Sequence, residues 1–92
     1  MSKSSSQSFR NLFALGSLAA SSGDLTKAAQ FFRAAINSDS QQALAHFALG
    51  SVHFLQENYT DALHCYDRAI ELNGDIKEFY HNRALVRRRM GL

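Results

Sequence analysis

The sequence contains no proline, no tryptophan and only one cysteine among its 92 residues. Without proline, the residue that most often interrupts a helix is missing, so the composition favours long helices over short strands joined by tight turns. The single cysteine, Cys65, excludes an internal disulfide and favours a reducing compartment. No apolar run approaches the roughly 18 residues that span a bilayer, so we expect no contact with a membrane.

Residues 43–76 contain two stretches with apolar residues at helical spacing, separated by the polar break Gln56-Glu57-Asn58. Gly50 lies inside the first stretch, where glycine costs about 1 kcal/mol relative to alanine. A glycine in such a place indicates that two helices approach closely, and Ala62 and Ala69 supply small residues to meet it. The segment therefore predicts a helical hairpin.

The same segment matches residues 9–42 when it is shifted back by 34 residues. Nine aligned pairs are identical, namely Phe13/Phe47, Ala14/Ala48, Leu15/Leu49, Gly16/Gly50, Ser17/Ser51, Thr26/Thr60, Ala28/Ala62, Ala35/Ala69 and Ile36/Ile70. Repetition with this period is typical of helical solenoids. Residues 77–92 fit the first helix of a third unit.

The repeated pattern of Leu-Gly, then Leu or an aromatic residue, Ala, an aromatic residue and Ala resembles the tetratricopeptide repeat. It is carried by Leu15, Gly16, Leu25, Ala28, Phe32 and Ala35, and again by Leu49, Gly50, Tyr59, Ala62, Tyr66 and Ala69. The resemblance implies an all-α, right-handed α-solenoid of about five antiparallel helices. Its expected organisation is a disordered Ser-rich tail (1–8), repeat 1 (9–42), repeat 2 (43–76), and a third-repeat or capping helix (77–92).

The resemblance also implies a concave groove lined by the first helix of each repeat. The family's groove positions give the candidates for partner binding, which are Phe13, Ser17, Leu44, Phe47, Ser51, Phe54, His81, Asn82, Leu85 and Arg89. This surface is apolar in its middle and charged at one end, which favours a protein or peptide partner with apolar anchors. Packing between helices explains the phenylalanines equally well.

Two other functions stay open at this point. In an unfinished third repeat, an exposed face could bind a second copy and form a homodimer, with Tyr80, Ala84, Leu85 and Met90 as the candidates. The cluster Arg83, Arg87, Arg88 and Arg89 could instead bind phosphate or RNA. Cations at a helix C-terminus are also favoured by the helix dipole, so we do not favour a nucleic-acid partner.

The sequence shows no sign of catalytic chemistry. The histidines and Cys65 lack the spacing of a zinc motif, and no phosphate-binding loop, GxGxxG or HExxH motif is present. We therefore expect no enzyme, no metal and no cofactor.

The cellular location rests on weaker signals. The tail is rich in serine, basic at Lys3 and Arg10, and free of acids, as organelle-import presequences are. The apolar residues that follow it are needed to pack the first repeat, and a cleaved segment could not supply them. We expect a cytoplasmic protein, with import into an organelle left open.

Overall fold

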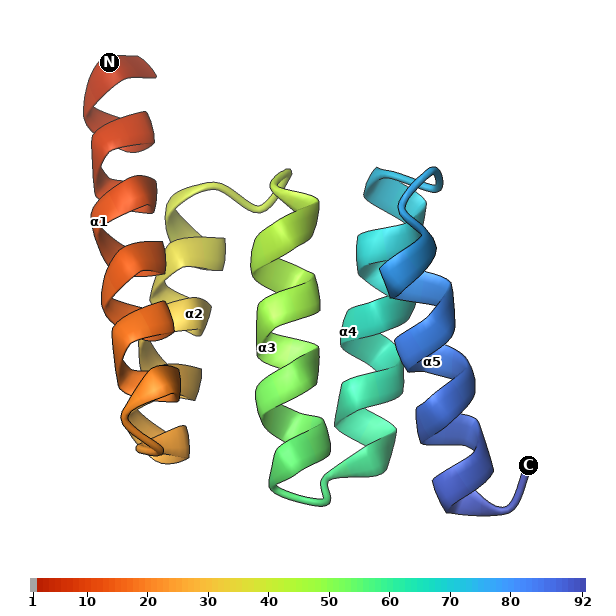
Figure 1. Cartoon of the computed structure of the whole chain (residues 1–92). Helices are drawn as coiled ribbons and strands as arrows, with labels where there is room; N and C mark the ends of the chain where they lie inside the picture. The colour runs from red at the N-terminus through yellow and green to blue at the C-terminus, as the bar shows by residue number, and fades with distance from the viewer. Residues whose placement is uncertain (1) are drawn as a thin grey trace.

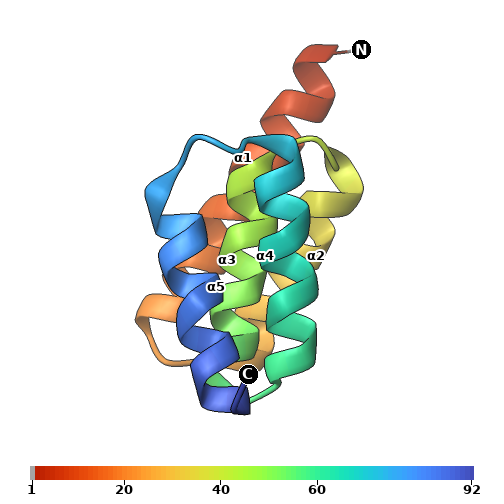
Figure 2. The ribbon, with the colours of Figure 1, turned by 90° about the vertical axis from the view of Figure 1, so that its right-hand side faces the viewer.

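The computed structural model describes residues 2–92, which form five α-helices and no strand. The helices are α1 (Ser2–Ser21), α2 (Leu25–Ser38), α3 (Ala43–Leu55), α4 (Tyr59–Leu72) and α5 (Lys77–Met90). Consecutive helices run antiparallel, with α1, α3 and α5 in one layer and α2 and α4 in the other (Figures 1 and 2). The predicted all-α array of five antiparallel helices is confirmed. None of the helices within residues 2–92 has the length and apolar character needed to cross a membrane.

The beginning of α1 corrects one expectation. The helix starts at Ser2, so the prediction of a disordered tail is wrong for residues 2–8, while Met1 lies outside the described residues. No glycine or proline stands in this stretch, and adding residues to an existing helix costs far less than starting one. Farther along, Gln7 Nε2 donates to Asn11 Oδ1 at 3.2 Å. The first turns project past α2 in Figure 1.

In the hairpins α1–α2 and α3–α4, the two helices approach each other closely at a glycine of the first helix, which packs against an aromatic ring of the second. An added Cβ would lie 2.6 Å from the ring of Phe32 at Gly16, and 2.8 Å from the ring of Tyr66 at Gly50. The predicted close approach at Gly50 therefore exists, but Ala62 and Ala69 are not its nearest neighbours. A flat ring covers the bare backbone more completely than a methyl group would, and the two alanines are fully buried elsewhere in the core.

The turns that end α1, α3 and α5 share one geometry. Gly23, Glu57 and Gly91, spaced 34 residues apart, have positive φ angles of 84°, 62° and 83°. The backbone N–H of the residue after each of them donates a hydrogen bond to the carbonyl oxygen five residues earlier, as from Asn58 N to His53 O at 2.8 Å. Such a left-handed residue satisfies the last carbonyls of a helix. The repeat therefore extends to the backbone of its turns.

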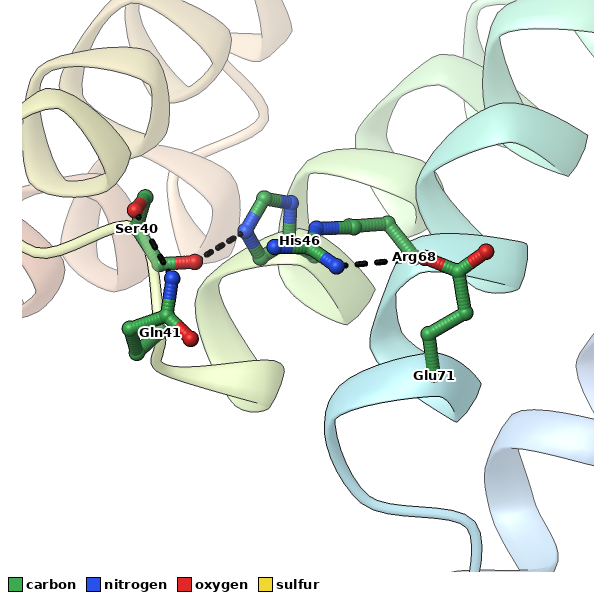
Figure 3. Close-up of polar contacts among 5 residues, drawn as sticks. All are labelled: Ser40, Gln41, His46, Arg68 and Glu71. Carbon is green, nitrogen blue, oxygen red and sulfur yellow. Dashed lines mark hydrogen bonds and ion pairs between the residues drawn. The ribbon is translucent and has the colours of Figure 1, made fainter.

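The connection between α2 and α3 is held by polar contacts. Asp39 accepts hydrogen bonds from the backbone N–H of Gln41 and from Gln42 Nε2, both at 3.0 Å, and these bonds lower the pKa of its carboxyl group. His46 Nε2 lies 2.9 Å from the carbonyl oxygen of Ser40 (Figure 3). His46 therefore ties the start of α3 to the turn that precedes it.

Candidate functional site

An apolar hollow of about 360 Å³ lies between α1 and α3, and we call it the α1–α3 groove. Its walls are Phe13, Ser17, Ala20, Phe32, Leu44, Phe47, Ala48, Ser51, Val52 and Leu55. None of these side chains is charged, and the only polar groups among them are two serine hydroxyls. The volume falls within the range of about 300–1,000 Å³ that is usual for binding pockets in proteins.

Half of the predicted partner-binding residues meet in this groove. They are Phe13, Ser17, Leu44, Phe47 and Ser51. Leu44 is 55% exposed, so its side chain is available to a partner at little cost to the fold. These residues come from α1 and α3, whose repeated sequence brings equivalent positions side by side.

The other predicted residues lie elsewhere. Phe54 packs against Tyr59 with ring centroids 5.8 Å apart, and the guanidinium of Arg89 lies 5.4 Å from the Phe54 ring centroid. His81 borders a separate hollow at the start of α5, and Leu85 is half-buried. The α1–α3 groove therefore does not extend to α5 as a single surface.

Leu55 is a groove residue that the sequence reasoning missed. It is 63% exposed and lines the groove, whereas the predicted Phe54 does not. At 3.6 residues per turn, Leu55 lies about 20° from Leu44 around α3, and Phe54 lies about 80° away. The spacing along the helix could have identified Leu55. The prediction followed the family's positions and favoured the aromatic side chain.

Phe47 serves the groove and the core together. Its ring centroid is 5.4 Å from that of Tyr66 and 4.8 Å from that of Phe79. Tyr66 is buried, with its hydroxyl 3.0 Å from Ser51 Oγ. Burial raises the pKa of the Tyr66 phenol, while hydrogen bonding with Ser51 and Asn82 acts in the opposite direction. The floor of the groove is thus fixed by contacts among α3, α4 and α5.

The arginines of α5 are divided among different contacts. Arg83 Nη1 lies 3.0 Å from Asp67 Oδ1 and the guanidinium of Arg83 lies 5.4 Å from the Tyr80 ring centroid. Arg87 and Arg88 are exposed. The four cations therefore do not form one converging site.

The self-association candidates differ in their surroundings. Tyr80 is exposed, but its hydroxyl donates to the carbonyl oxygen of Gly74 at 2.8 Å. Ala84 and Met90 are exposed, and Leu85 is half-buried. These four residues of α5 therefore differ in exposure, and one of them, Tyr80, already makes a hydrogen bond within the chain.

His53 is the buried polar side chain of α3, and no hydrogen-bond partner reaches its Nδ1. Burial lowers the pKa of its imidazole, and Arg33 of α2 acts in the same direction. Asp61 of α4 and hydrogen bonding with Gln56 oppose that shift. Burial also raises the pKa of the neighbouring Cys65 thiol, to about 11, so this thiol is protonated near neutral pH. No group of three or more metal-ligating side chains occurs in the part of the chain that the structure describes.

Acid is expected to destabilise the protein through His53. Its pKa is lower in the folded state than the ordinary value of 6.5, so the unfolded chain takes up the proton first as the pH falls. The stability that neutral His53 provides is complete above pH 6.5 and is lost from there down to the folded pKa. When the pH is lowered from 8 to 5, the melting temperature of the wild type should decrease below about pH 6.5. The fall should be smaller for His53→Gln, and equal slopes for both proteins would contradict the assignment.

The chain was compared with known proteins. Two sequence profiles described as "Tetratricopeptide repeat" match residues 43–75 and residues 4–43. A crystal structure of MamA matches with a TM-score of 0.87 and 28% identity, covering 90% of this chain and 48% of that one. A second MamA crystal structure matches with a TM-score of 0.86 and 28% identity, covering 90% and 45%. No curated protein sequence matches significantly.

This chain therefore spans about half the length of the MamA structures that it resembles. The two profiles together cover both hairpins, α1–α2 and α3–α4, at the places where the repeated Leu-Gly and Ala-aromatic patterns stand. Repeats of this kind form interaction scaffolds for other proteins. From its repeated sequence, its paired helices and these matches, the chain belongs to the tetratricopeptide repeat family.

Proposed function

We propose that the protein is a non-enzymatic scaffold that binds a peptide segment of another protein in the α1–α3 groove. The observation that carries this proposal is the groove itself, which is open and uncharged and has two exposed leucines on its rim, Leu44 and Leu55. Exposed leucines at the rim of a hollow provide apolar surface, and a partner that buries this surface gains binding free energy.

The groove favours a partner with one or two apolar anchors. Its centre is formed by the rings of Phe13 and Phe47, and its polar groups are the hydroxyls of Ser17 and Ser51. Ser51 Oγ is already engaged with Tyr66, which leaves Ser17 as the more available hydroxyl. Affinity would then come mainly from aliphatic or aromatic side chains that enter the hollow.

The charge around the groove favours acidic residues next to those anchors. Of the two helices that line the groove on either side, α1 carries the cations Lys3 and Arg10 and α3 carries no charged residue, so neither helix contributes an acid. Complementary charge at a rim raises the association rate and is weakened by salt.

The test is a selection of 12-residue peptides from a random displayed library against the wild-type protein. We expect the selected peptides to contain apolar anchors flanked by Asp or Glu. Leu44→Asp should weaken their binding by about 10-fold or more, because a carboxylate would be buried beside the anchor. Fluorescence anisotropy of labelled peptides measures the affinities.

The matched control is Leu92→Asp, the same substitution at a leucine that is 77% exposed and outside the groove. It should leave peptide affinity unchanged, and both variants should melt within about 2 °C of the wild type. Equal affinity of the selected peptides for Leu44→Asp and wild type would place the binding site elsewhere and overturn the proposal.

The alternatives stay predictions. Homodimerisation through Tyr80, Ala84, Leu85 and Met90 would appear as a concentration-dependent mass in light scattering. RNA or phosphate binding through the α5 arginines would be strongly salt-dependent and reduced by Arg87→Ala. The cytoplasmic location stays a prediction from the single cysteine.

A further inference from the structure

A second apolar surface lies on the other side of α1, and we call it the N-terminal face. It is a hollow of about 360 Å³ whose walls are Leu15, Leu18, Ala19, Ser22, Asp24, Lys27 and Phe31. Leu15 is 43% exposed and Leu18 is 65% exposed. In Figure 1, α1 stands at one end of the array, with α2 and α3 on the same side of it. The surface shares no residue with the α1–α3 groove.

The internal repeat shows what covers the same face one unit later. Leu49 and Val52 of α3 occupy the positions of Leu15 and Leu18, yet they are only 7% and 2% exposed. They share a core with Ala28, Ala29 and Phe32 of α2. A helix of the preceding repeat therefore covers this face of α3.

The arrangement recurs at α5. Val86, which corresponds to Val52 and Leu18, is completely buried and forms a core with Ala62 and Tyr66 of α4. In both cases the covering helix presents a small residue and an aromatic ring four positions later: Ala28 and Phe32, or Ala62 and Tyr66. The same kind of interface is thus built twice within this chain, and among residues 2–92 no helix covers the equivalent face of α1.

From this symmetry we propose that the N-terminal face binds one amphipathic helix of a partner protein. The apolar side of that helix carries a small residue and an aromatic ring at positions i and i+4, as α2 and α4 do. It lies along Leu15 and Leu18 as α2 lies along Leu49 and Val52. This surface is separate from the groove, and the proposal does not depend on the function proposed for the groove.

Charge distinguishes the partner helix from α2. Asp61 and Arg33 both act on the side chains of His53 and Cys65, so α2 supplies a cation on the side where α4 supplies an acid. The position of Asp61 is occupied by Lys27 in the first repeat, on the rim of the N-terminal face. An acidic residue in the place of Arg33 would pair with Lys27, while Asp24, which lines the same hollow, already accepts a hydrogen bond from the backbone N–H of Lys27.

The test uses a labelled synthetic peptide with the sequence of residues 25–38 and the change Arg33→Glu, titrated into the full chain. We expect saturable binding that shifts the backbone amide NMR signals of residues 15–22 and 27–31. Leu18→Asp should weaken it about 10-fold or more, because a charge would enter the apolar contact. Leu92→Asp should leave it unchanged, and a control peptide that also carries Phe32→Asp should not bind.

Four results would overturn the proposal. One is no binding at peptide concentrations up to about 1 mM, where even weak helix docking is measurable. The second is equal binding by wild type and Leu18→Asp, which would mean that the peptide displaces the protein's own α2. The third is loss of binding by Leu44→Asp, which would place the peptide in the groove. The fourth is a wild-type dimer in light scattering that Leu18→Asp dissociates, because a second copy would then occupy the face.

Discussion

Replacing Phe79 by alanine is expected to lower the free energy of unfolding by about 3–5 kcal/mol, as for other large buried aromatic residues. Phe79 is fully buried and stacks on Phe47 at 4.8 Å, so it joins α5 to the floor of the groove. A small domain has about 5–15 kcal/mol of stability in total, so the loss is a large fraction of it. Urea denaturation measures the change.

The loss should be concentrated in α5. Each helix of such an array contacts mainly its neighbours, so weakening one end loosens that end first. Amide hydrogen exchange should therefore quicken most in α5 and least in α1 and α2. Met90→Ala, on the same helix but at a partly exposed site, should cost less than about 0.5 kcal/mol. Uniform loss of protection in Phe79→Ala would contradict the view of α5 as a separately held unit.

Replacing Gly50 by leucine is expected to cost about 3 kcal/mol, near the upper end for overpacking. A Cβ at this position would lie 2.8 Å from the ring of Tyr66 and 3.0 Å from Cys65 Cβ. Tyr66 is buried and packs on Phe47, so its ring has little room to move aside. For a domain of this size, the melting temperature should fall by more than about 10 °C.

The matched control for Gly50→Leu is Ala84→Leu. Ala84 stands at the equivalent place in α5, 34 residues later, and is exposed. Because this site is exposed, the melting temperature should change by no more than about 2 °C. A Gly50→Leu protein as stable as the wild type would show that α3 and α4 can separate freely.

The fold could be predicted from the sequence because the pattern that indicates it occurs twice. The Leu-Gly and Ala-aromatic patterns appear twice at a period of 34, and each copy supports the reading of the other. The residue that meets Gly50 could not be found in this way. Spacing identifies the buried face of a helix but does not determine which side chain on it, Ala62, Tyr66 or Ala69, lies nearest to a given backbone atom.

The helical start of α1 escaped prediction because serine composition is a weak guide to structure. Serine is only a moderately poor helix former, and a stretch adjoining a stable helix extends it at low cost. Composition alone treats residues 1–8 as if they were separate from the first helix, whereas α1 runs without a break from Ser2 to Ser21.

The candidate site was predictable only in part. Periodicity brought Phe13, Leu44 and Phe47 together, because equivalent positions in successive repeats are neighbours in space. The position of Phe54 outside the groove follows from its place around α3, but its contact with Arg89 at the end of α5 could not be inferred from local spacing. The N-terminal face was also missed. Exposure of Leu15 and Leu18 becomes informative only when their buried counterparts, Leu49 and Val52, are known.

The turn at Glu57 has a consequence for how this chain can vary. Gly23 and Gly91 adopt the left-handed conformation without penalty, whereas a side chain there costs on the order of 1 kcal/mol. The strained residue lies in the central hairpin, which has α2 on one side and α5 on the other. The outer turns, with support from one side only, retain glycine. A residue other than glycine in the left-handed position should therefore be tolerated better in the central turn than in the two outer turns.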